Sequence, residues 1–265
     1  MSPGGARADG DRGEKGESRV TDKEWLLIEG RHPVEEALAS GRAVREVLLQ
    51  EGIGEGAFQR LTRLASQRGV KVRTLSRPEF RKLTRSSAPQ GVAAWVESVR
   101  YIDLEELIAR AAPPGLILIC DRIVDPHNLG ALIRSAQAAG ASGVVVPKDR
   151  SAPVNETVVK SSAGAALRLP IVRVTNLARS IERLKEAGYW VVGASMDGDR
   201  TLWEVDFLAP TAIVIGGEGK GLSRLVAESC DILARIPMPG SMESLNASVA
   251  GALFLFEAVR QRSTS

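Results

Sequence analysis

The segment GLILICDRIVDPHNLGALIRSAQAAGASGVVVP, residues 115–147, decides the fold class of this chain. It contains two short apolar runs, Leu116–Ile119 and Val144–Val146, separated by a stretch at 129–139 that has the spacing of a helix. Apolar runs that alternate with helices predict the strands of a parallel sheet that is covered on both faces. The pattern continues toward the end of the chain with further runs and a further helix at Trp190–Val192, Ala212–Ile215, Ile232–Ile236 and Leu177–Ala187. We therefore expect an α/β domain over residues 114–265.

The preceding part of the chain has a different pattern. Residues 23–98 alternate short helical stretches with strand-like ones such as Val44–Leu49, which predicts a small α/β domain. Between Arg60 and Arg85, nine Lys or Arg residues stand against the single acid Glu79. This surplus of positive charge suits the phosphate backbone of a nucleic acid. It could instead form the ordinary solvated surface of a basic helix and loop.

Two segments flank this small domain. Residues 1–22 hold five glycines and nine charged residues with almost nothing apolar, which predicts a disordered tail. Residues 99–113, which lead into the pair Pro113-Pro114, are expected to be a linker or to supply the first helix of the larger domain.

The composition excludes several classes of protein. No stretch approaches the roughly 18 apolar residues that a membrane span needs, and the first thirty residues lack the apolar core of a secretory signal. We therefore expect a cytoplasmic protein. Only two cysteines and two histidines occur, without metal-ligand spacing. No metal site is expected, and Cys120 and Cys230 are expected to be packing residues.

Three polar loops follow or flank the predicted strands, and the ligands of parallel sheets bind at the carboxyl ends of strands. The first loop is DPHNLGALIRSA, residues 125–136, where a strand turns into a helix. We expect Asn128 to cap this helix, with Gly130 just inside it and Arg134 about a turn and a half further along. A capped helix start that carries an arginine is also an ordinary structural device.

The second loop is IGGEGKGLS, residues 215–223, whose glycines would let backbone amides approach a ligand closely. It does not match a Walker A loop because Lys220 is followed by Gly221, and its glycines lack the spacing of a dinucleotide fingerprint. Glu218 would repel a phosphate but favour a cation or a hydroxyl donor. The alternative is a glycine-rich turn with an exposed acid.

The third segment is IPMPGSMESLNASVAGALFLFEAV, residues 236–259, in which a loop leads into the last helix of the chain. Apolar walls for a flat base would come from Ile236, Met238 and Leu245. Hydrogen-bonding groups at the helix start would come from Ser244 and Asn246. Plain helix capping is the alternative role for both polar residues. The helix itself is apolar nearly all round, so we expect a partner subunit to cover the surface that one-sided packing would leave in water.

Together the three loops resemble the three motifs of the SpoU family of RNA ribose methyltransferases. The matching residues are N-L-G-x-x-x-R-S-A at 128–136, G-G-E-G-x-G-L at 216–222 and I-P-M-x-G-x-x-x-S-L-N-x-S-V-A at 236–250. One motif could arise by chance, but all three in this order are very specific. The resemblance covers about residues 114–262. Residues 24–98 resemble the small RNA-binding domain that precedes the methyltransferase domain in bacterial large-subunit rRNA guanosine 2′-O-methyltransferases.

The resemblance implies an α/β fold whose C-terminal segment forms a trefoil knot. It also implies that S-adenosyl-L-methionine binds bent into the knotted loops and that a homodimer completes the active site. Contacts to the adenosine are implied for Gly216, Ile236 and Leu245, with Ala194, Ser195, Gly217 and Met238 nearby in the same pocket. The polar active-site positions of the family correspond to Asn128, Arg134, Glu218, Ser244 and Asn246.

The implied reaction is an in-line attack of a ribose 2′-oxygen on a sulfonium methyl group, which requires positioning and proton removal. A guanidinium is effectively always protonated in proteins. We therefore expect Arg134 to hold a phosphate and stabilise the oxyanion rather than act as the base. The proton acceptor stays open among the substrate phosphate, Glu218 and water.

Large-subunit rRNA is the expected substrate, with guanosine as the target base that the resemblance implies, and tRNA is the alternative. From a different class, the chain could be a non-catalytic RNA-binding factor for ribosome assembly. The presence of all five polar motif residues argues against such a decayed site. A nucleotide hydrolase is disfavoured because the Walker pattern is broken.

Overall fold

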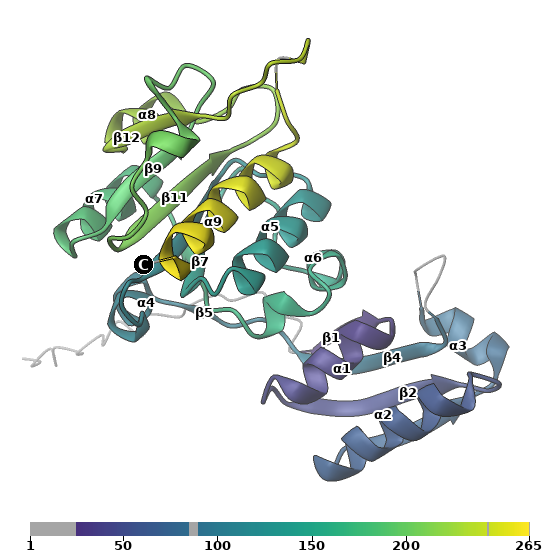
Figure 1. The fold of residues 1–265 in the computed structure, drawn as a ribbon. Helices are drawn as coiled ribbons and strands as arrows, with labels where there is room; N and C mark the ends of the chain where they lie inside the picture. The colour runs from purple at the N-terminus through teal and green to yellow at the C-terminus, as the bar shows by residue number, and fades with distance from the viewer. Residues whose placement is uncertain (1–24, 85–89, 243, 265) are drawn as a thin grey trace, which may run out of the picture.

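The computed structural model describes residues 25–84, 90–242 and 244–264, which form two sheets with their helices (Figure 1). The N-terminal sheet has the order β1-β4-β2-β3, in which β2 and β3 are parallel and the other pairs are antiparallel. Its strands are β1 (Trp25–Glu29), β2 (Val44–Gln50), β3 (Lys71–Leu75) and β4 (Val92–Glu97), and its helices are α1 (Arg31–Ala39), α2 (Glu55–Gln67) and α3 (Arg77–Leu83). The predicted disordered tail at 1–22 lies outside the described residues.

Successive side chains of β2 pack on opposite faces of the N-terminal sheet. Val47 and Leu49 point to the face that α1 and α2 cover, whereas Leu48 points to the opposite face and packs with Phe80 of α3. This is the period of two expected of a strand whose neighbouring side chains point to opposite faces. Both faces of the small sheet are therefore covered by helices.

Part of the basic surplus between residues 60 and 85 is used inside this domain. Arg60 and Arg73 form ion pairs with Glu35 and Glu46, and Arg68 donates to backbone carbonyls at the end of α1 and in the turn after it. At least three of the nine basic residues therefore stabilise the domain itself, which leaves fewer of them for a nucleic acid.

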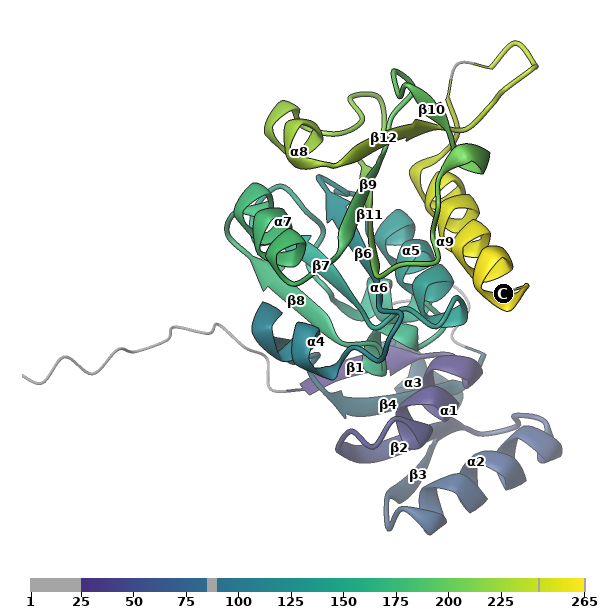
Figure 2. The same ribbon diagram turned by 60° about the vertical axis from the view of Figure 1, so that its left-hand side comes forward.

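The second sheet has eight strands in the order β10-β12-β9-β11-β6-β7-β8-β5, and every pairing within it is parallel. Helices α4, α7 and α8 cover one face and α5, α6 and α9 the other (Figure 2). The strands are β5 (Tyr101–Ile102), β6 (Leu116–Asp121), β7 (Gly143–Pro147), β8 (Ile171–Val174), β9 (Trp190–Ala194), β10 (Arg200–Thr201), β11 (Thr211–Gly216) and β12 (Ile232–Arg235). The helices are α4 (Leu104–Arg110), α5 (Pro126–Ala138), α6 (Glu156–Ser161), η1 (Ala165–Leu167), α7 (Leu177–Glu186), η2 (Leu202–Glu204), α8 (Arg224–Ser229) and α9 (Ala247–Ser263).

All five apolar runs predicted as strands are strands of this sheet, and the predicted parallel α/β class is confirmed. The segment 99–113 supplies β5, which pairs with β8 of the larger sheet, and α4. Leu107 of α4 is fully buried against the larger sheet, which makes this segment part of the second domain. The sequence pattern missed β8 and the two-residue strands at the sheet edges.

The chain crosses itself at the end of the sheet where the motif loops lie. Strand β12 lies between β9 and β10, although β9 and β10 are joined by a short connection at 195–199. Gly198 in that connection lies against the backbone of Leu233 and Ala234, and a Cβ atom there would stand 2.7 Å from the Leu233 carbonyl oxygen. The connection therefore passes directly across β12, as the knotted fold predicted from the resemblance requires.

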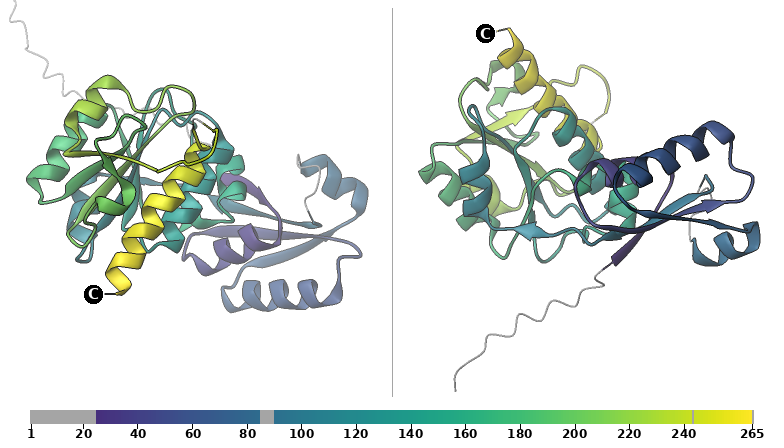
Figure 3. Two further views of the ribbon diagram at one scale, coloured as in Figure 1. Left: turned by 45° about the horizontal axis from the view of Figure 1, so that its top comes forward. Right: turned by 90° about the horizontal axis from the view of Figure 1, so that it is seen from below.

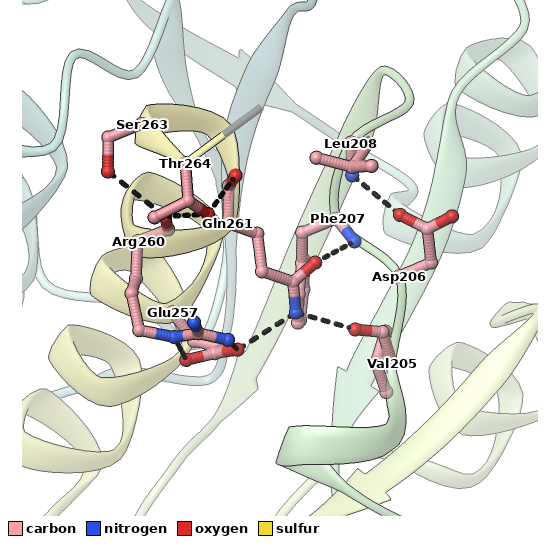
Figure 4. Close-up of polar contacts among 9 residues, drawn as sticks. All are labelled: Val205, Asp206, Phe207, Leu208, Glu257, Arg260, Gln261, Ser263 and Thr264. Carbon is pink, nitrogen blue, oxygen red and sulfur yellow. Dashed lines mark hydrogen bonds and ion pairs between the residues drawn. The ribbon is translucent and has the colours of Figure 1, made fainter.

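The C-terminal end of α9 is bonded to the segment that joins β10 to β11 (Figure 4). Gln261 accepts from the Phe207 amide at 2.9 Å and donates to the Val205 carbonyl and to Glu257. Hydrogen bonds from Arg260 hold the pKa of the buried Glu257 carboxyl below its usual value. The network fixes α9 against the segment that runs beside it.

The two domains contact each other beside α6 and η1 (Figure 3). Arg42 donates to the Leu167 carbonyl at 2.6 Å, and Arg168 pairs with Glu36 at 2.9 Å. Gly164 packs so closely on Glu36 that a Cβ atom would stand 2.5 Å from the Glu36 Cβ.

None of the helices in the described residues combines the length and apolar character that a bilayer crossing requires.

Both cysteines have the packing role predicted for them. Cys120 is fully buried in β6, and Cys230, at the end of α8, donates its thiol to the Val226 carbonyl. Burial raises the pKa of each thiol to about 12, so neither forms the thiolate needed for nucleophilic chemistry near neutral pH.

Candidate active site

Three polar side chains from the three motif loops form a hydrogen-bonded triangle. Asn128 Nδ2 donates to Glu218 Oε1 at 2.8 Å, and Asn246 Nδ2 donates to the same oxygen at 2.6 Å. Asn246 Nδ2 also lies 3.0 Å from Asn128 Oδ1. The three residues are 28 to 118 positions apart in the sequence, so this contact exists only because the fold brings the start of α5, the loop after β11 and the start of α9 together.

Asn246 has two roles at once, because it caps α9 and also donates into the triangle. Its Oδ1 accepts from the Ser248 backbone amide at 2.9 Å and from the Ser248 hydroxyl at 2.6 Å. Since the oxygen of the amide is used as the cap, the nitrogen must face the other way. Capping therefore orients the donor toward Glu218, and the two roles proposed for this residue are not alternatives.

The predicted capping role of Asn128 is wrong. The cap of α5 is Asp125, whose Oδ1 accepts from the His127 amide at 2.9 Å, and Pro126 occupies the first helical position. An acidic cap followed by proline is a strong signal for a helix start, and it begins this helix two residues before Asn128. Asn128 is therefore free of capping and lies in the first turn, only 9% exposed, with its amide committed to the triangle.

The loop that carries Glu218 is a tight turn closed on itself. The Gly221 amide donates to the Gly217 carbonyl at 3.0 Å, and Gly219 and Gly221 have φ angles of +78° and +58°. These left-handed values are accessible to glycine without the steric cost that a Cβ atom would add. The turn holds Glu218 at an exposed position next to the starts of α5 and α9.

The carboxyl end of β6 anchors this turn. The Asp121 carboxylate accepts from the Ser223 amide at 2.5 Å, and Arg122 Nη2 donates to the Gly221 carbonyl at 3.2 Å. A Cβ atom on Gly217 would stand 2.4 Å from the Arg122 carbonyl oxygen. Neither anchoring residue could be selected from the sequence, because nothing in the spacing of the chain relates position 121 to position 223.

The residues predicted to bind the cofactor lie at the carboxyl ends of three adjacent strands or in the loops that follow them. Strands β12, β9 and β11 are neighbours in the sheet, and Ala194 is paired with Ala234 at the carboxyl end. The side chains of Ile236 and Met238 are half-buried after β12, and Leu245 is 39% exposed. The positions predicted for the cofactor on these three loops are Ala194 and Ser195, Gly216 and Gly217, and Ile236, Met238 and Leu245.

Arg134 and Ser244 are the predicted catalytic residues that the triangle does not include. Arg134 is exposed on α5, about a turn and a half beyond Asn128, and has no hydrogen bond or ion pair with the described residues. Ser244 is also exposed, directly before the start of α9. Both side chains are therefore available to a substrate.

The fold and the site together define an RNA methyltransferase of the knotted α/β class. The knotted parallel sheet carries the polar triangle at its carboxyl edge and is joined to a small basic domain. Residues 115–256 match the SpoU rRNA methylase family, and residues 27–102 match the substrate-binding domain of RNA 2′-O-ribose methyltransferases. The chain belongs to the SpoU rRNA methylase family.

Similar proteins span nearly the whole chain. A protein of Pseudomonas aeruginosa named 23S rRNA (guanosine-2′-O-)-methyltransferase RlmB is 44% identical over 247 residues, covering 90% of this chain and 98% of that protein. A putative TrmH family tRNA/rRNA methyltransferase of Staphylococcus saprophyticus is 41% identical over 90% of this chain and 97% of its own length. The crystal structure of the SpoU methyltransferase AviRb from Streptomyces viridochromogenes with AdoMet has a TM-score of 0.76 at 32% identity, covering 91% of this chain and 92% of that one.

We expect Gly217→Ala to weaken the binding of S-adenosylmethionine at least about tenfold, because the new methyl group would push the turn away from the Arg122 carbonyl. Isothermal titration measures the affinity. Gly56→Ala in α2, where a Cβ atom meets nothing within 4 Å, is the matched control and should bind the cofactor like the parent. Equal affinity of the Gly217 variant and the parent would show that the turn does not shape the cofactor site.

Proposed function

We propose that this chain transfers the methyl group of S-adenosylmethionine to the 2′-hydroxyl of a guanosine in large-subunit rRNA, in the cytoplasm. The observation that carries the proposal is the convergence of Asn128, Glu218 and Asn246 at the edge where the three cofactor loops lie. The names of relatives such as the RlmB proteins support the rRNA substrate and the guanosine. Other relatives bear names that include tRNA, which is the second candidate substrate.

The residues present suit the cofactor. The half-exposed side chains of Ile236, Met238 and Leu245 offer an apolar surface for a flat base. Gly216 and Gly217 pack directly on the Gly221 backbone and the Arg122 carbonyl, which keeps the loop that would hold the cofactor tight. S-adenosylmethionine supplies an electrophilic methyl group on a sulfonium, so the protein must position the ribose oxygen and accept its proton.

Glu218 is the proton acceptor that the geometry favours among the three candidates. Both amides of the triangle donate to its Oε1, and Oε2 has no partner in the described part of the chain. The free oxygen can accept a hydrogen bond from a ribose hydroxyl while the bonded one holds the carboxylate in place.

Arg134 would bind the phosphate next to the target ribose. Its guanidinium is exposed and unpaired within the described residues, and it projects from the helix that also carries Asn128. A fixed positive charge there orients the RNA and stabilises the negative charge that develops on the 2′-oxygen. Ser244, exposed next to Asn246, would add a hydrogen bond to the substrate.

We also propose that two copies of the chain form a homodimer through α9. Val249, Leu253 and Phe256 are 47%, 36% and 47% exposed. They follow the spacing of one helical face, so they form an apolar stripe that the described part of the chain leaves uncovered. A second copy would bury this stripe and bring its own residues toward the motif loops.

Methyl transfer from labelled S-adenosylmethionine to unmodified large-subunit rRNA transcripts and to unmodified tRNA tests the function directly. We expect transfer to rRNA at a ribose 2′-oxygen, which mass spectrometry of the nuclease fragments locates. Transfer to tRNA alone would replace the proposed substrate by the second candidate. Cofactor binding without transfer to either RNA would favour a non-catalytic RNA-binding factor.

Arg134→Ala is expected to lower the methylation rate by at least about 100-fold and to leave the affinity for S-adenosylmethionine within about twofold of the parent, because the side chain contacts the substrate only. Single-turnover rates and calorimetry measure the two quantities. Arg110→Ala, which removes an exposed arginine from α4, is the control. Equal turnover by the Arg134 variant and the parent would refute the role.

Phe256→Glu is expected to convert the dimer into a monomer, because two carboxylates would be buried in the symmetric contact. Sedimentation velocity measures the mass, and circular dichroism checks that the chain stays folded. Phe58→Glu, at a site on α2 that is 39% exposed, should leave the mass unchanged. A parent protein that sediments as a monomer would contradict the proposed assembly.

A further inference from the structure

A cavity lies on the face of the larger sheet opposite to the hydrogen-bonded triangle. It has a volume of about 570 Å³ and lies at the carboxyl ends of β6, β7 and β8, against the first residues of α7 and α8. Ligands of parallel sheets bind at this edge. Its polar lining residues are Asp121, Arg122, Asp149, Arg150, Thr175, Asn176 and Ser223. None of them belongs to the motifs that the proposed reaction uses.

Two arginines make this cavity suitable for a phosphate. Arg150 is exposed and has no partner within the described residues. Arg122 is partly used, because its Nη2 donates to the Gly221 carbonyl and its buried Nε lies 3.7 Å from Asp121 Oδ1, which leaves Nη1 for a phosphate. Both residues have φ angles of +58°, and the only other non-glycine residues of the described chain with positive φ are Gln90 and Ala163. Such unfavourable backbone conformations concentrate at ligand sites.

The two acidic residues that line the cavity do not prevent it from binding a phosphate. Asp121 is 3% exposed and is committed to the Ser223 amide and to Arg122, so it anchors the wall of the cavity. Asp149 is exposed at the surface and can accept a hydrogen bond from a ligand. An isolated inorganic anion would be repelled by Asp149, whereas a nucleotide offers both a phosphate and hydrogen-bond donors.

The remaining walls are apolar. Pro147, Leu225 and Val226 line the cavity, and Leu225 is 59% exposed, so an uncovered apolar side chain faces it. A nucleobase can pack on such a surface. The combination of two arginines, one free carboxylate and an apolar wall therefore matches a nucleotide better than a simple anion or an apolar ligand.

This cavity shares its wall with the loop that carries Glu218. Ser223 lines the cavity and Glu218 joins the triangle, and because these positions are five residues apart in the chain, their separation cannot exceed about 18 Å. Arg122 lines the cavity and also donates to Gly221 in the same loop. A strand of RNA whose ribose lies at Glu218 can therefore reach the cavity with a nearby nucleotide.

We propose that this cavity binds a nucleotide that flanks the methylated one in the RNA strand, with Arg122 and Arg150 on its phosphate and Asp149 on a base or sugar donor. The inference rests on the proposed function, since it concerns the same RNA. It adds a contact on the face of the sheet remote from α5 and α9. The site positions the strand and takes no part in the chemical step.

Two variants test the site by different means. Arg150→Ala removes one phosphate contact, and Ala178→Phe fills the cavity without any change of charge. The probe is the unmodified transcript that the parent methylates, and its dissociation constant is measured by filter binding at about 50 and about 200 mM salt. Arg179→Ala is the matched control, because Arg179 is an exposed arginine on the same helix as Ala178 and does not line the cavity.

We expect both variants to bind RNA about 5- to 10-fold more weakly. The slope of log affinity against log salt concentration should fall by about one, the value of one lost phosphate contact, for Arg150→Ala only. Their affinity for S-adenosylmethionine, and that of the control for both ligands, should stay within about twofold of the parent. Unchanged RNA affinity in both cavity variants, while the parent still methylates the transcript, would overturn the site and leave the proposed function intact. A parent that methylates neither rRNA nor tRNA would overturn both.

Discussion

One carboxylate oxygen, Oε1 of Glu218, accepts hydrogen bonds from two amides that belong to distant parts of the chain. The buried amide of Asn128 would be unfavourable without a partner, and Asn246 donates to both Glu218 and Asn128, so each of the three side chains restrains the other two. The start of α5, the turn after β11 and the start of α9 are thereby held at one point. Every role proposed for this site depends on that restraint, because it positions the free oxygen of Glu218 relative to the cofactor loops and to Arg134.

The crossing of the chain explains why these loops meet. Insertion of β12 between β9 and β10 makes β12, β9 and β11 neighbours, so the loops that follow them leave the sheet side by side. The close approach of Gly198 to the β12 backbone allows the crossing, and the hydrogen bonds of Gln261 hold the returning helix in place. The same strand order places the end of β6 under the glycine turn. Asp121 and Arg122 at this end hold the turn and also line the cavity beside α7 and α8, so they connect the cofactor loops with that cavity.

Much of the fold could be predicted from the sequence, because the five buried strands are continuous apolar runs. Strand β8 was missed because Arg173 interrupts its short apolar pattern, and β5 and β10 are too short to show any period. The crossing of β12 could not be predicted from periodicity, since it depends on the spatial order of strands; the expectation came from the resemblance alone.

The candidate site shows the same division. The residue types at 128, 218 and 246 could be selected from the three motifs, but their mutual contacts span up to 118 positions and no local rule predicts them. The error at Asn128 had a local cause, because the Asp-Pro pair before it is the stronger helix start. Asp121 and Arg122 were missed since they follow a strand without a motif, and only the fold shows that they anchor the turn.

A double-mutant cycle between Asn128 and Asn246 tests the central claim most directly. Asn128→Ala removes one donor, and Asn246→Ser removes the other while keeping a side chain that caps α9. Single-turnover methylation rates of the parent, the two single variants and the double variant give the coupling. If both amides act through Glu218, the double variant should be little slower than the slower single variant, with a coupling of at least about 1 kcal/mol. Effects that add to within about 0.5 kcal/mol would show that the two residues act independently, and the account would be wrong.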